Sequence, residues 1–270
     1  MIQFLGDVYT IWYRDILRYI NNRARIFSSL GQPFLWLVIF GSGMRGTFQL
    51  FGAGNFDFIQ FLFPGTIGIT ILFTAIFSSI STVRDREVGF LKEILVAPVS
   101  RASIAIGKIL GGATIASLQA LLMLVFAPIV GIKLSLPLIL GLIPAIFLVA
   151  FTIASFGMVL AARLRSTEGF QVVMNLVMMP LFLLSGALFP LTDIPGWMEI
   201  LSRINPVSYS IDLLRQVVFL HLAVPQVVAD SFKITVLGMK MGLWQDVLIV
   251  AVFAVLFSSL GTFFFSRSER

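Results

Sequence analysis

Long apolar stretches alternate with short charged segments along the whole of this 270-residue chain. Six of these stretches contain no Asp, Glu, Lys, Arg or His. Each has roughly the 20 residues that a helix needs to cross a bilayer. The pattern predicts an all-α polytopic membrane protein, with residues 1–270 forming a single transmembrane domain. Its six transmembrane helices are expected at residues 26–44, 58–83, 109–132, 134–162, 169–192 and 247–266.

The composition excludes a water-soluble protein. Mean hydropathy is +1.00, and only 12% of residues are charged, whereas soluble domains carry about 25%. The chain has no cysteine and one histidine, so disulfides, thiolate sites and most transition-metal sites are not expected. We therefore predict no catalytic residue and no metal site.

The basic residues predict the orientation. Thirteen of the 19 Lys and Arg residues fall on one side of the six predicted helices. Because basic residues concentrate in cytoplasmic segments, both termini are expected in the cytoplasm, in a multi-pass protein of the cell (inner or plasma) membrane. These residues lie at the edges of the apolar stretches, which indicates membrane lipid head groups, and no nucleic acid, as their partner.

The residues before the first apolar stretch predict an amphipathic helix. Its apolar side carries Trp12, which would anchor the helix in the head-group plane. A helix packed on a partner protein is the alternative. On a helical wheel the apolar side carries Leu5, Val8, Trp12, Ile16 and Tyr19. The opposite, polar side carries Asp7, Arg14 and Arg18.

The segment 193–246 lies on the outer side and contains signals for two helix starts. Pro195 suits a first helical turn, and Asn205 followed by Pro206 is typical of a capped helix start. Asp212 and Arg215 are expected to pair at i, i+3. This segment is too apolar for a loop in water, so we predict short re-entrant or outer helices that dip into the outer leaflet; a plain external loop is the alternative.

Neither of two usual energy sources is visible in the sequence. No ionisable residue lies within the six apolar stretches, whereas ion-coupled carriers place such residues in the membrane. A phosphate-binding G-x-x-x-x-G-K-[ST] loop is also missing, since Ile109 follows the only Gly-Lys pair, Gly107–Lys108. A chain that moves a substrate uphill must therefore draw energy from another protein.

The cytoplasmic segment 84–108 is the most structured charged part of the sequence. Apolar residues at helical spacing predict a short amphipathic helix of mixed charge, which Pro98 ends. The residues alone leave two interpretations open. The helix either docks in a groove of a cytosolic partner or lies on the membrane without a partner.

Several segments in order resemble one family. EVGFLKEILVAPVSRASIAIGK, which starts at Glu87, is similar to the first cytoplasmic loop of type-2 ATP-binding-cassette (ABC) exporter permeases. The similarity is greatest to the branch of the daunorubicin-resistance and nodulation-factor export permeases. It continues through RDILRYINNRARIFSSLGQPFLWLVIFGSGM, FPGTIGITILFTAIFSS and LSGALFPLTDIPGWMEILSRINPVSYSIDLLRQVVF.

The resemblance implies the permease subunit of an ATP-driven exporter, without a nucleotide site or cofactor of its own. ATP and Mg²⁺ would be bound by two copies of a separate cytosolic ABC ATPase. A second permease, most simply an identical one, would complete the complex. An amphipathic, drug-like or lipid- or glycolipid-like substrate would leave the cytoplasm or inner leaflet. The alternatives are a membrane scaffold or lipid-binding assembly factor, which transports nothing, and an ion-coupled carrier.

The resemblance also implies two sets of functional residues. In the first set, which would couple to the ATPase, Phe90 departs from the family, where many members have a small polar residue. Its members are Arg84, Asp85, Arg86, Glu87, Gly89, Phe90, Leu91, Lys92 and Glu93. The second set would line a substrate path between the second and fifth helices, although ordinary helix packing or lipid contact is the simpler explanation of each residue. Its members are Phe73, Phe77, Asn175, Phe182 and Phe189.

Overall fold

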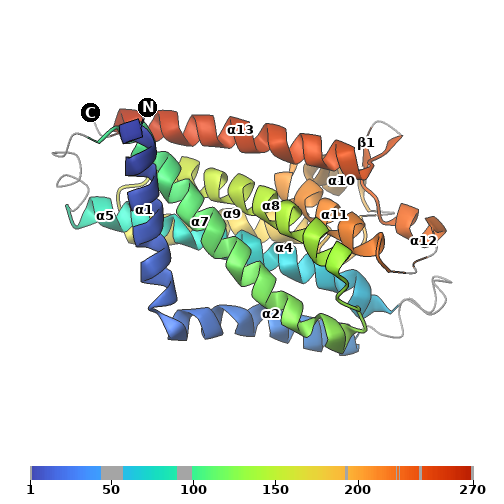
Figure 1. The fold of residues 1–270 in the computed structure, drawn as a ribbon. Helices are drawn as coiled ribbons and strands as arrows, with labels where there is room; N and C mark the ends of the chain where they lie inside the picture. The colour runs from blue at the N-terminus through green and yellow to red at the C-terminus, as the bar shows by residue number, and fades with distance from the viewer. Residues whose placement is uncertain are drawn as a thin grey trace.

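The structure is a computed structural model that describes residues 2–43, 57–89, 99–191, 194–222, 224, 226–236 and 239–268. Helices dominate it, with one small antiparallel hairpin near the C-terminal helix (Figure 1). The elements are α1 Ile2–Ile20, α2 Arg23–Gly43, α4 Phe58–Ser78, α5 Ile80–Glu87, α7 Arg101–Met123, 3-10 helix η1 Leu124–Val130, α8 Leu136–Arg163, α9 Thr167–Leu183, α10 Gly196–Ile204, α11 Pro206–Phe219, α12 Gln226–Ser231, β1 Thr235–Val236, β2 Met239–Lys240 and α13 Leu243–Ser268.

A helix occupies each of the six predicted apolar stretches. Among the described residues, four helical segments are long and apolar enough to cross a membrane, namely Phe58–Glu87, Arg101–Val130, Leu136–Arg163 and Leu243–Arg267. The other two stretches hold the shorter apolar helices Leu30–Gly43 and Thr167–Leu183. The structure confirms the class, an all-α polytopic membrane protein; the number of six crossings stays a prediction.

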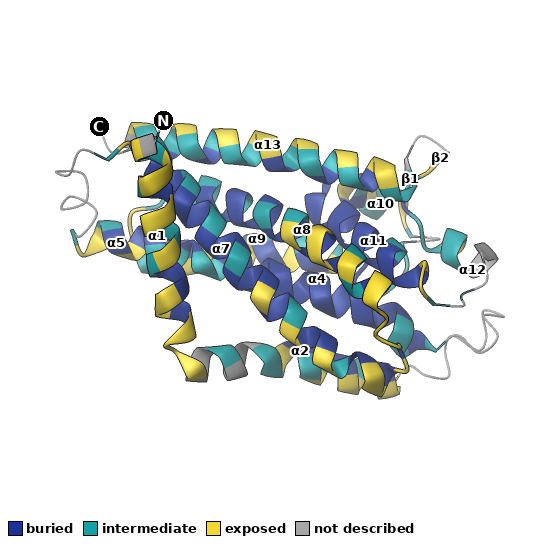
Figure 2. Cartoon of the chain, in the orientation of Figure 1, coloured by how far each residue is buried: buried dark blue, intermediate teal, exposed yellow. Residues whose placement is uncertain are grey.

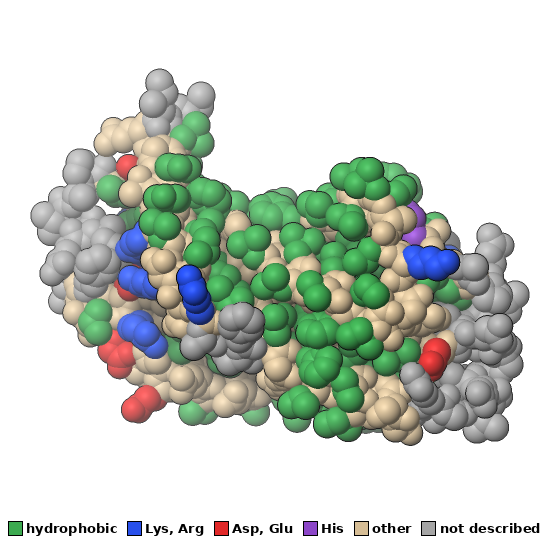
Figure 3. Space-filling model, turned by 60° about the horizontal axis from the view of Figure 1, so that its bottom comes forward, with side chains coloured by type: hydrophobic (Ala, Val, Ile, Leu, Met, Phe, Trp, Pro, Cys, Tyr) green, Lys and Arg blue, Asp and Glu red, His purple; other side chains and the backbone are tan. Residues whose placement is uncertain are grey.

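The bundle has two distinct ends. Helix α1 begins and α13 ends at the same end, which we call the terminal end, whereas α10, α12 and the hairpin lie at the opposite end (Figure 1). In the space-filling view, charged side chains gather at the two ends and an apolar surface lies between them (Figure 3). A surface of this kind fits a bilayer, in which exposed charge is costly.

Helix α4 is the centre of the bundle. In the most apolar window of Phe58–Glu87, 78% of the residues are buried, against 17% in the peripheral α13 (Figure 2). The side chains of Phe58, Phe61 and Phe63 are all at most 1% exposed. Lipid tails are as apolar as these side chains, so close packing rather than transfer out of water stabilises the bundle.

Helix α1 lies across the terminal end, roughly perpendicular to the bundle helices (Figure 1). It packs against α7, and Val8, Ile11 and Tyr19 are buried on the inner side. This placement suits the predicted interfacial helix. The indole Nε1 of Trp12 donates a hydrogen bond to Thr114 Oγ1 of α7 at 3.0 Å, and its role as a membrane anchor stays a prediction.

Side-chain caps fix several helix starts. Ser100, Ser135 and Ser166 each accept a hydrogen bond from a backbone N–H in the first turn of α7, α8 and α9. The predicted cap at Asn205 is confirmed, since Asn205 Oδ1 accepts from Val207 N at 2.9 Å, directly before Pro206 opens α11.

Two helices differ in extent from the predicted apolar stretches. Helix α7 begins at Arg101, so residues 101–108, which the prediction assigns to the cytoplasmic loop, form its first two turns; the point at which it enters the membrane stays a prediction. Helix α9 ends at Leu183 rather than near residue 192, and the chain turns through Gly186, whose φ of +73° favours glycine. The first difference arises because Lys108 bounds the uncharged stretch, whereas the helix itself continues past this charge.

The outer segment packs inside the protein. All but one of the 14 residues of α11 are buried, among α4, α8 and α13. This rules out a plain external loop for α11. Burial among apolar helices suits the predicted re-entrant helix, and its depth in the outer leaflet stays a prediction. Asp212 and Arg215 make no ion pair within 4 Å, although their charges attract each other. The Arg215 guanidinium instead donates to Gly186 O at 2.6 Å and lies over the Phe61 ring.

The contact between α4 and residue 187 generates a stability prediction. A Cβ at Gly65 would lie 2.3 Å from the carbonyl oxygen of Ala187, which cannot move as a side chain does. We expect Gly65→Ala to lower the free energy of unfolding by about 1–3 kcal/mol through overpacking. Gly6→Ala is the matched control, because its Cβ would meet nothing within 4 Å. Thermal unfolding of both variants in detergent measures the difference, and equal transitions would contradict this account of the packing.

Candidate functional site

A cluster of charged side chains at the terminal end joins α1, α5 and α7. At its centre the Asp85 carboxylate accepts a hydrogen bond from Lys108 Nζ at 2.7 Å. The two side chains are only 6% and 2% exposed. Arg14 Nη2 lies 3.5 Å from Asp85 and 3.1 Å from Asp15, and Arg18 Nη1 lies 3.9 Å from Asp85. Because a buried charge is stable only when it is paired, this cluster fixes α5 against α1 and α7.

The next two residues of α5 attach it to two further helices. Arg86 Nη1 donates to Ala161 O at 3.1 Å and to Leu164 O at 2.7 Å, at the C-terminal end of α8. The Glu87 carboxylate accepts from Thr167 N at 3.2 Å and from Thr167 Oγ1 at 2.5 Å, at the N-terminus of α9. Each charge has the sign that stabilises the helix end it contacts.

The two hydrogen bonds from Thr167 also lower the pKa of Glu87, which lies beyond the predicted second transmembrane helix. A carboxylate with a lowered pKa stabilises the fold above its ordinary pKa, and the stabilisation is lost as the pH falls. The contact between α5 and α9 is therefore intact at neutral pH.

Helix α5 thus contacts four helices through three consecutive side chains. Asp85, Arg86 and Glu87 were predicted to act at the ATPase, and here they hold α5 to its own bundle. Arg84 is exposed, and Gly89 adopts a φ of +79° at the end of the described segment. The predicted coupling residues Phe90, Leu91, Lys92 and Glu93 lie outside the described residues.

A cavity of about 530 Å³ lies beside this cluster, between α1, α2 and α4. Its volume is in the usual range for small-molecule sites. Apolar side chains form one part of its lining, and the hydroxyl groups of α4 and α5 form another. The lining residues are Arg18, Tyr19, Asn22, Gln32, Pro33, Ile69, Thr70, Phe73, Thr74, Phe77, Ser78, Ile80, Ser81 and Arg84.

The cavity is amphipathic. Arg18 and Arg84 place two guanidinium groups in its lining, and the stacked rings of Phe73 and Phe77 add an apolar surface. The hydroxyl of Thr70 donates to a carbonyl of its own helix, so its oxygen remains an acceptor. The arrangement suits a molecule with an anionic or polar head and an apolar tail.

The structure separates the predicted path residues. Phe73 and Phe77 line the cavity, and Phe182 of α9 packs edge-on against Phe73 with the ring centroids 6.3 Å apart. Asn175 is exposed on α9, and the half-buried Phe189 lies after that helix; neither is part of the lining. Only three of the five residues therefore lie together.

The sequence contained an unused signal for this cavity. Thr70, Thr74 and Ser78 recur at every fourth position of α4, which places three hydroxyl groups on one helix face. Arg18 and Gln32 offered no comparable signal, since the fold of α1 and α2 brings them to the cavity.

A second buried cluster lies at the opposite end of the bundle. Gln216 Nε2 donates to Asp212 Oδ2 at 3.2 Å and to Asp246 Oδ2 at 2.5 Å. Asp246 is fully buried in the first turn of α13. The sequence predicts both acids in the outer segment and gives no sign that they are buried. Their burial results from the packing of α11 into the bundle.

Potential metal ligands do not cluster in the described part of the chain. It contains no group of three or more His, Cys, Asp or Glu side chains placed to hold a metal ion. The predicted absence of a metal site stays a prediction.

The long apolar helices, with charged side chains at the two ends of the bundle, define the class of polytopic membrane proteins. The chain belongs to the ABC-2 type transporter family, whose model matches residues 6–219. This confirms the resemblance seen in the sequence. Permeases of this family function with an ABC ATPase.

Three relatives show how far the similarity extends. The ycf38 protein of Cyanophora paradoxa, named as a transport permease, is 28% identical over 93% of this chain and 86% of its own length. Nodulation protein J of Rhizobium meliloti (strain 1021) is 29% identical, with 77% and 79% covered. YbhR of Escherichia coli (strain K12), named as a multidrug ABC transporter permease, is 29% identical over 60% of this chain and 45% of its own.

The buried pair generates a prediction about the terminal end. Asp85→Asn leaves the ammonium of Lys108 buried without its carboxylate, so we expect the free energy of unfolding to fall by about 3–5 kcal/mol. Adding Lys108→Met removes the orphaned charge and should restore part of the loss. The exposed Glu168 supplies the control Glu168→Gln, expected to change stability by less than about 1 kcal/mol. Thermal unfolding in detergent compares the variants; if Asp85→Asn unfolds like the control, the cluster is not a structural constraint.

Proposed function

We propose that this chain is the transmembrane subunit of an ATP-driven exporter that moves an amphipathic, lipid-like molecule out of the cytoplasm or inner leaflet. The observation that carries the proposal is the attachment of α5 to four helices through Asp85, Arg86 and Glu87. A force on the segment that follows Gly89 would reach α1, α7, α8 and α9 together. Coupling to a separate motor protein needs such a rigid connection.

In this proposal the working complex contains two permeases, most simply identical, and two cytosolic ABC ATPase subunits. ATP and Mg²⁺ are bound by the ATPases, and this chain supplies no cofactor. The terminal end faces the cytoplasm of the cell membrane, as the excess of basic residues there supports. Closure of the ATPases would shift the permease between two packings of its helices, and the substrate site would open alternately to each side.

The cavity supports the substrate class. Its guanidinium groups suit an anionic or polar head, and its phenylalanine rings suit an apolar tail. The names of the relatives, a nodulation protein and a multidrug transporter permease, are compatible with an amphipathic cargo. We therefore expect anionic amphiphiles to bind better than cationic ones of the same chain length.

Gly89 provides the test of coupling. A residue with a Cβ at its φ of +79° is strained by about 1–2 kcal/mol, and Asn tolerates this region better than β-branched residues. We expect Gly89→Val to insert and fold normally but to retain about 5- to 30-fold less ATPase. Gly89→Asn should retain most of it.

The measurement is affinity purification of the tagged permease from its native membranes, followed by peptide mass spectrometry and an ATP hydrolysis assay. The retained partner is expected to carry the G-x-x-x-x-G-K-[ST] motif and to hydrolyse ATP. If the intact wild-type permease retains no such ATPase, a membrane scaffold becomes the better interpretation. If Gly89→Val retains as much ATPase as Gly89→Asn, the segment after α5 is not the coupling element.

Phe73 provides the test of the cavity. In reconstituted vesicles, dodecyl phosphate should stimulate ATP hydrolysis by the wild-type complex more than dodecyltrimethylammonium does. Phe73→Ala should weaken the stimulation by about tenfold, since it removes a large apolar contact area. Phe147→Ala is the matched control, because Phe147 is 42% exposed on α8 and lies outside the cavity lining. Equal responses of the two variants would move the substrate site elsewhere.

A further inference from the structure

A second cavity, of about 350 Å³, lies at the end of the bundle opposite the termini. It is formed by α10, by residues around α12 and by the hairpin, which Figure 1 places together at that end. Three basic and two acidic side chains line it. The charged lining residues are Glu199, Arg203, Asp230, Lys233 and Lys240.

Helix α10 places this cavity at the depth of lipid head groups. One side of α10 exposes Trp197, Ile200 and Ile204, each by about 60%. A short amphipathic helix with a tryptophan on its apolar side lies in the membrane interface. Its other side turns Ser202 and Arg203 towards the cavity. The cavity therefore opens beside the head groups of the leaflet at that end.

One buried hydroxyl group in the lining has no hydrogen-bond partner. The hydroxyl of Ser202 is buried, the residue being 3% exposed, and its oxygen has no hydrogen-bond partner. Buried hydroxyl groups are nearly always hydrogen-bonded. A ligand atom in the cavity would satisfy it.

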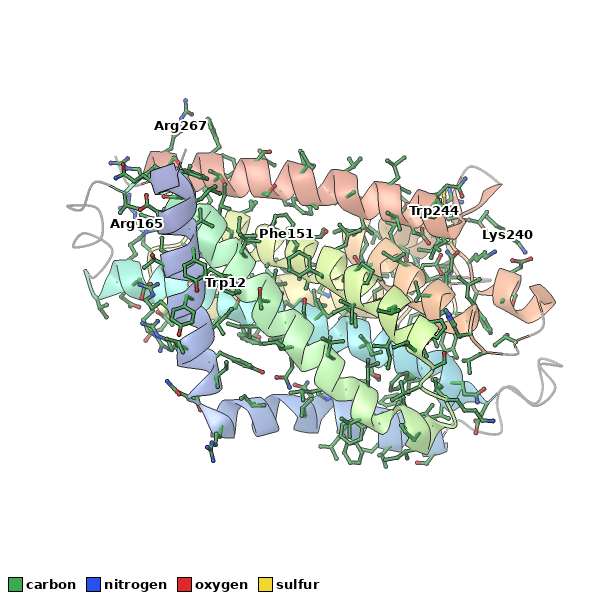
Figure 4. All side chains as sticks on the ribbon, viewed as in Figure 1. Trp12, Phe151, Arg165, Lys240, Trp244 and Arg267 are labelled. Atoms are coloured by element: carbon green, nitrogen blue, oxygen red, sulfur yellow. The ribbon has the colours of Figure 1, made fainter. Side chains whose placement is uncertain are left out.

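The charges indicate what kind of ligand fits. Arg203 pairs with Glu199 and Lys233 pairs with Asp230, at 2.5 and 2.6 Å. The hydrogen bond from Lys233 lowers the pKa of Asp230, so this carboxylate is ionised at neutral pH. Lys240, in β2 of the hairpin, makes no ion pair within 4 Å with a described carboxylate, although its charge also helps to lower the pKa of Asp230. Figure 4 shows Lys240 at the same end as Trp244. The lining thus offers charges of both signs, three cations and two carboxylates, to a ligand that carries both signs itself.

From this lining we propose a binding site for a zwitterionic phosphate-bearing head group of the phosphoethanolamine class. The phosphate would accept hydrogen bonds from Lys240, Arg203 and the Ser202 hydroxyl, and the primary ammonium would donate to Glu199 and Asp230. The acyl chains would leave past the apolar wall of Leu191 and Ile194 onto the exposed side of α10. The site does not depend on ATP-driven export, and it is separate from the cavity beside α1.

Lipid retention by the purified full-length chain tests the site. After delipidation in detergent, the protein is mixed with phosphatidylethanolamine or phosphatidylcholine of identical acyl chains, and bound lipid is counted by native mass spectrometry. Phosphatidylethanolamine should be retained about threefold to tenfold more, because a trimethylammonium group donates no hydrogen bond to the two carboxylates.

Two variants locate the binding. Lys240→Gln and Ser202→Ala should each lower phosphatidylethanolamine retention by about threefold to tenfold. Lys133→Gln is the control, because Lys133 is an exposed lysine outside the cavity and its replacement removes the same charge. Lys240 is exposed, so its replacement should leave thermal unfolding unchanged.

Three results would overturn the proposal. They are equal retention of the two lipids, equal retention by Lys240→Gln and Lys133→Gln, and full displacement of the lipid by millimolar inorganic phosphate. The last result would identify a free-phosphate site instead of a lipid site. The two proposals can fail independently. If the permease retains no ATPase but binds phosphatidylethanolamine as expected, the head-group site stands and only the export function is overturned.

Discussion

The Asp85 carboxylate is the centre on which the arrangement of the terminal end depends. Two charges buried this deeply are unfavourable unless they stay together, so Asp85 and Lys108 hold α5 and α7 in one relative position. Arg14 and Arg18 bring α1 to the same carboxylate. Helix α1, the start of α7 and helix α5 therefore form one unit. Arg86 and Glu87 extend that unit to α8 and α9, which no apolar contact of so short a helix would achieve.

The same cluster explains where sequence reasoning succeeded and where it did not. The absence of charge located the apolar helices well, and Phe58 begins α4 as predicted. The start of α7 was not predictable in this way, because Lys108 bounds the uncharged stretch and its partner lies 23 residues earlier in the chain. The burial of Asp212 and Asp246 was not predictable for the same reason. The sequence shows that a charged residue is present. Whether that residue can be buried depends on the partner that the fold places beside it.

The positions of the predicted path residues also depend on the tertiary structure. All five path residues were predicted through the family resemblance, and Phe73 and Phe77 lie together because they are one helical turn apart on α4. Asn175 is exposed in the middle of α9, and Phe189 lies beyond the end of that helix at Leu183. Arg18 and Gln32 come from two other helices. A cavity between three helices needs the tertiary arrangement, which no local pattern encodes.

The length of α9 has a consequence for the membrane itself. Its 17 residues span about 25 Å as an α-helix, which is less than the roughly 30 Å of an average hydrocarbon core. Lipids beside a short helix adapt by compressing, at a small cost in free energy for each ångström of mismatch. We expect a local dimple in the bilayer along this helix, where the hydrophobic barrier to a polar head group would be lower than in the surrounding membrane.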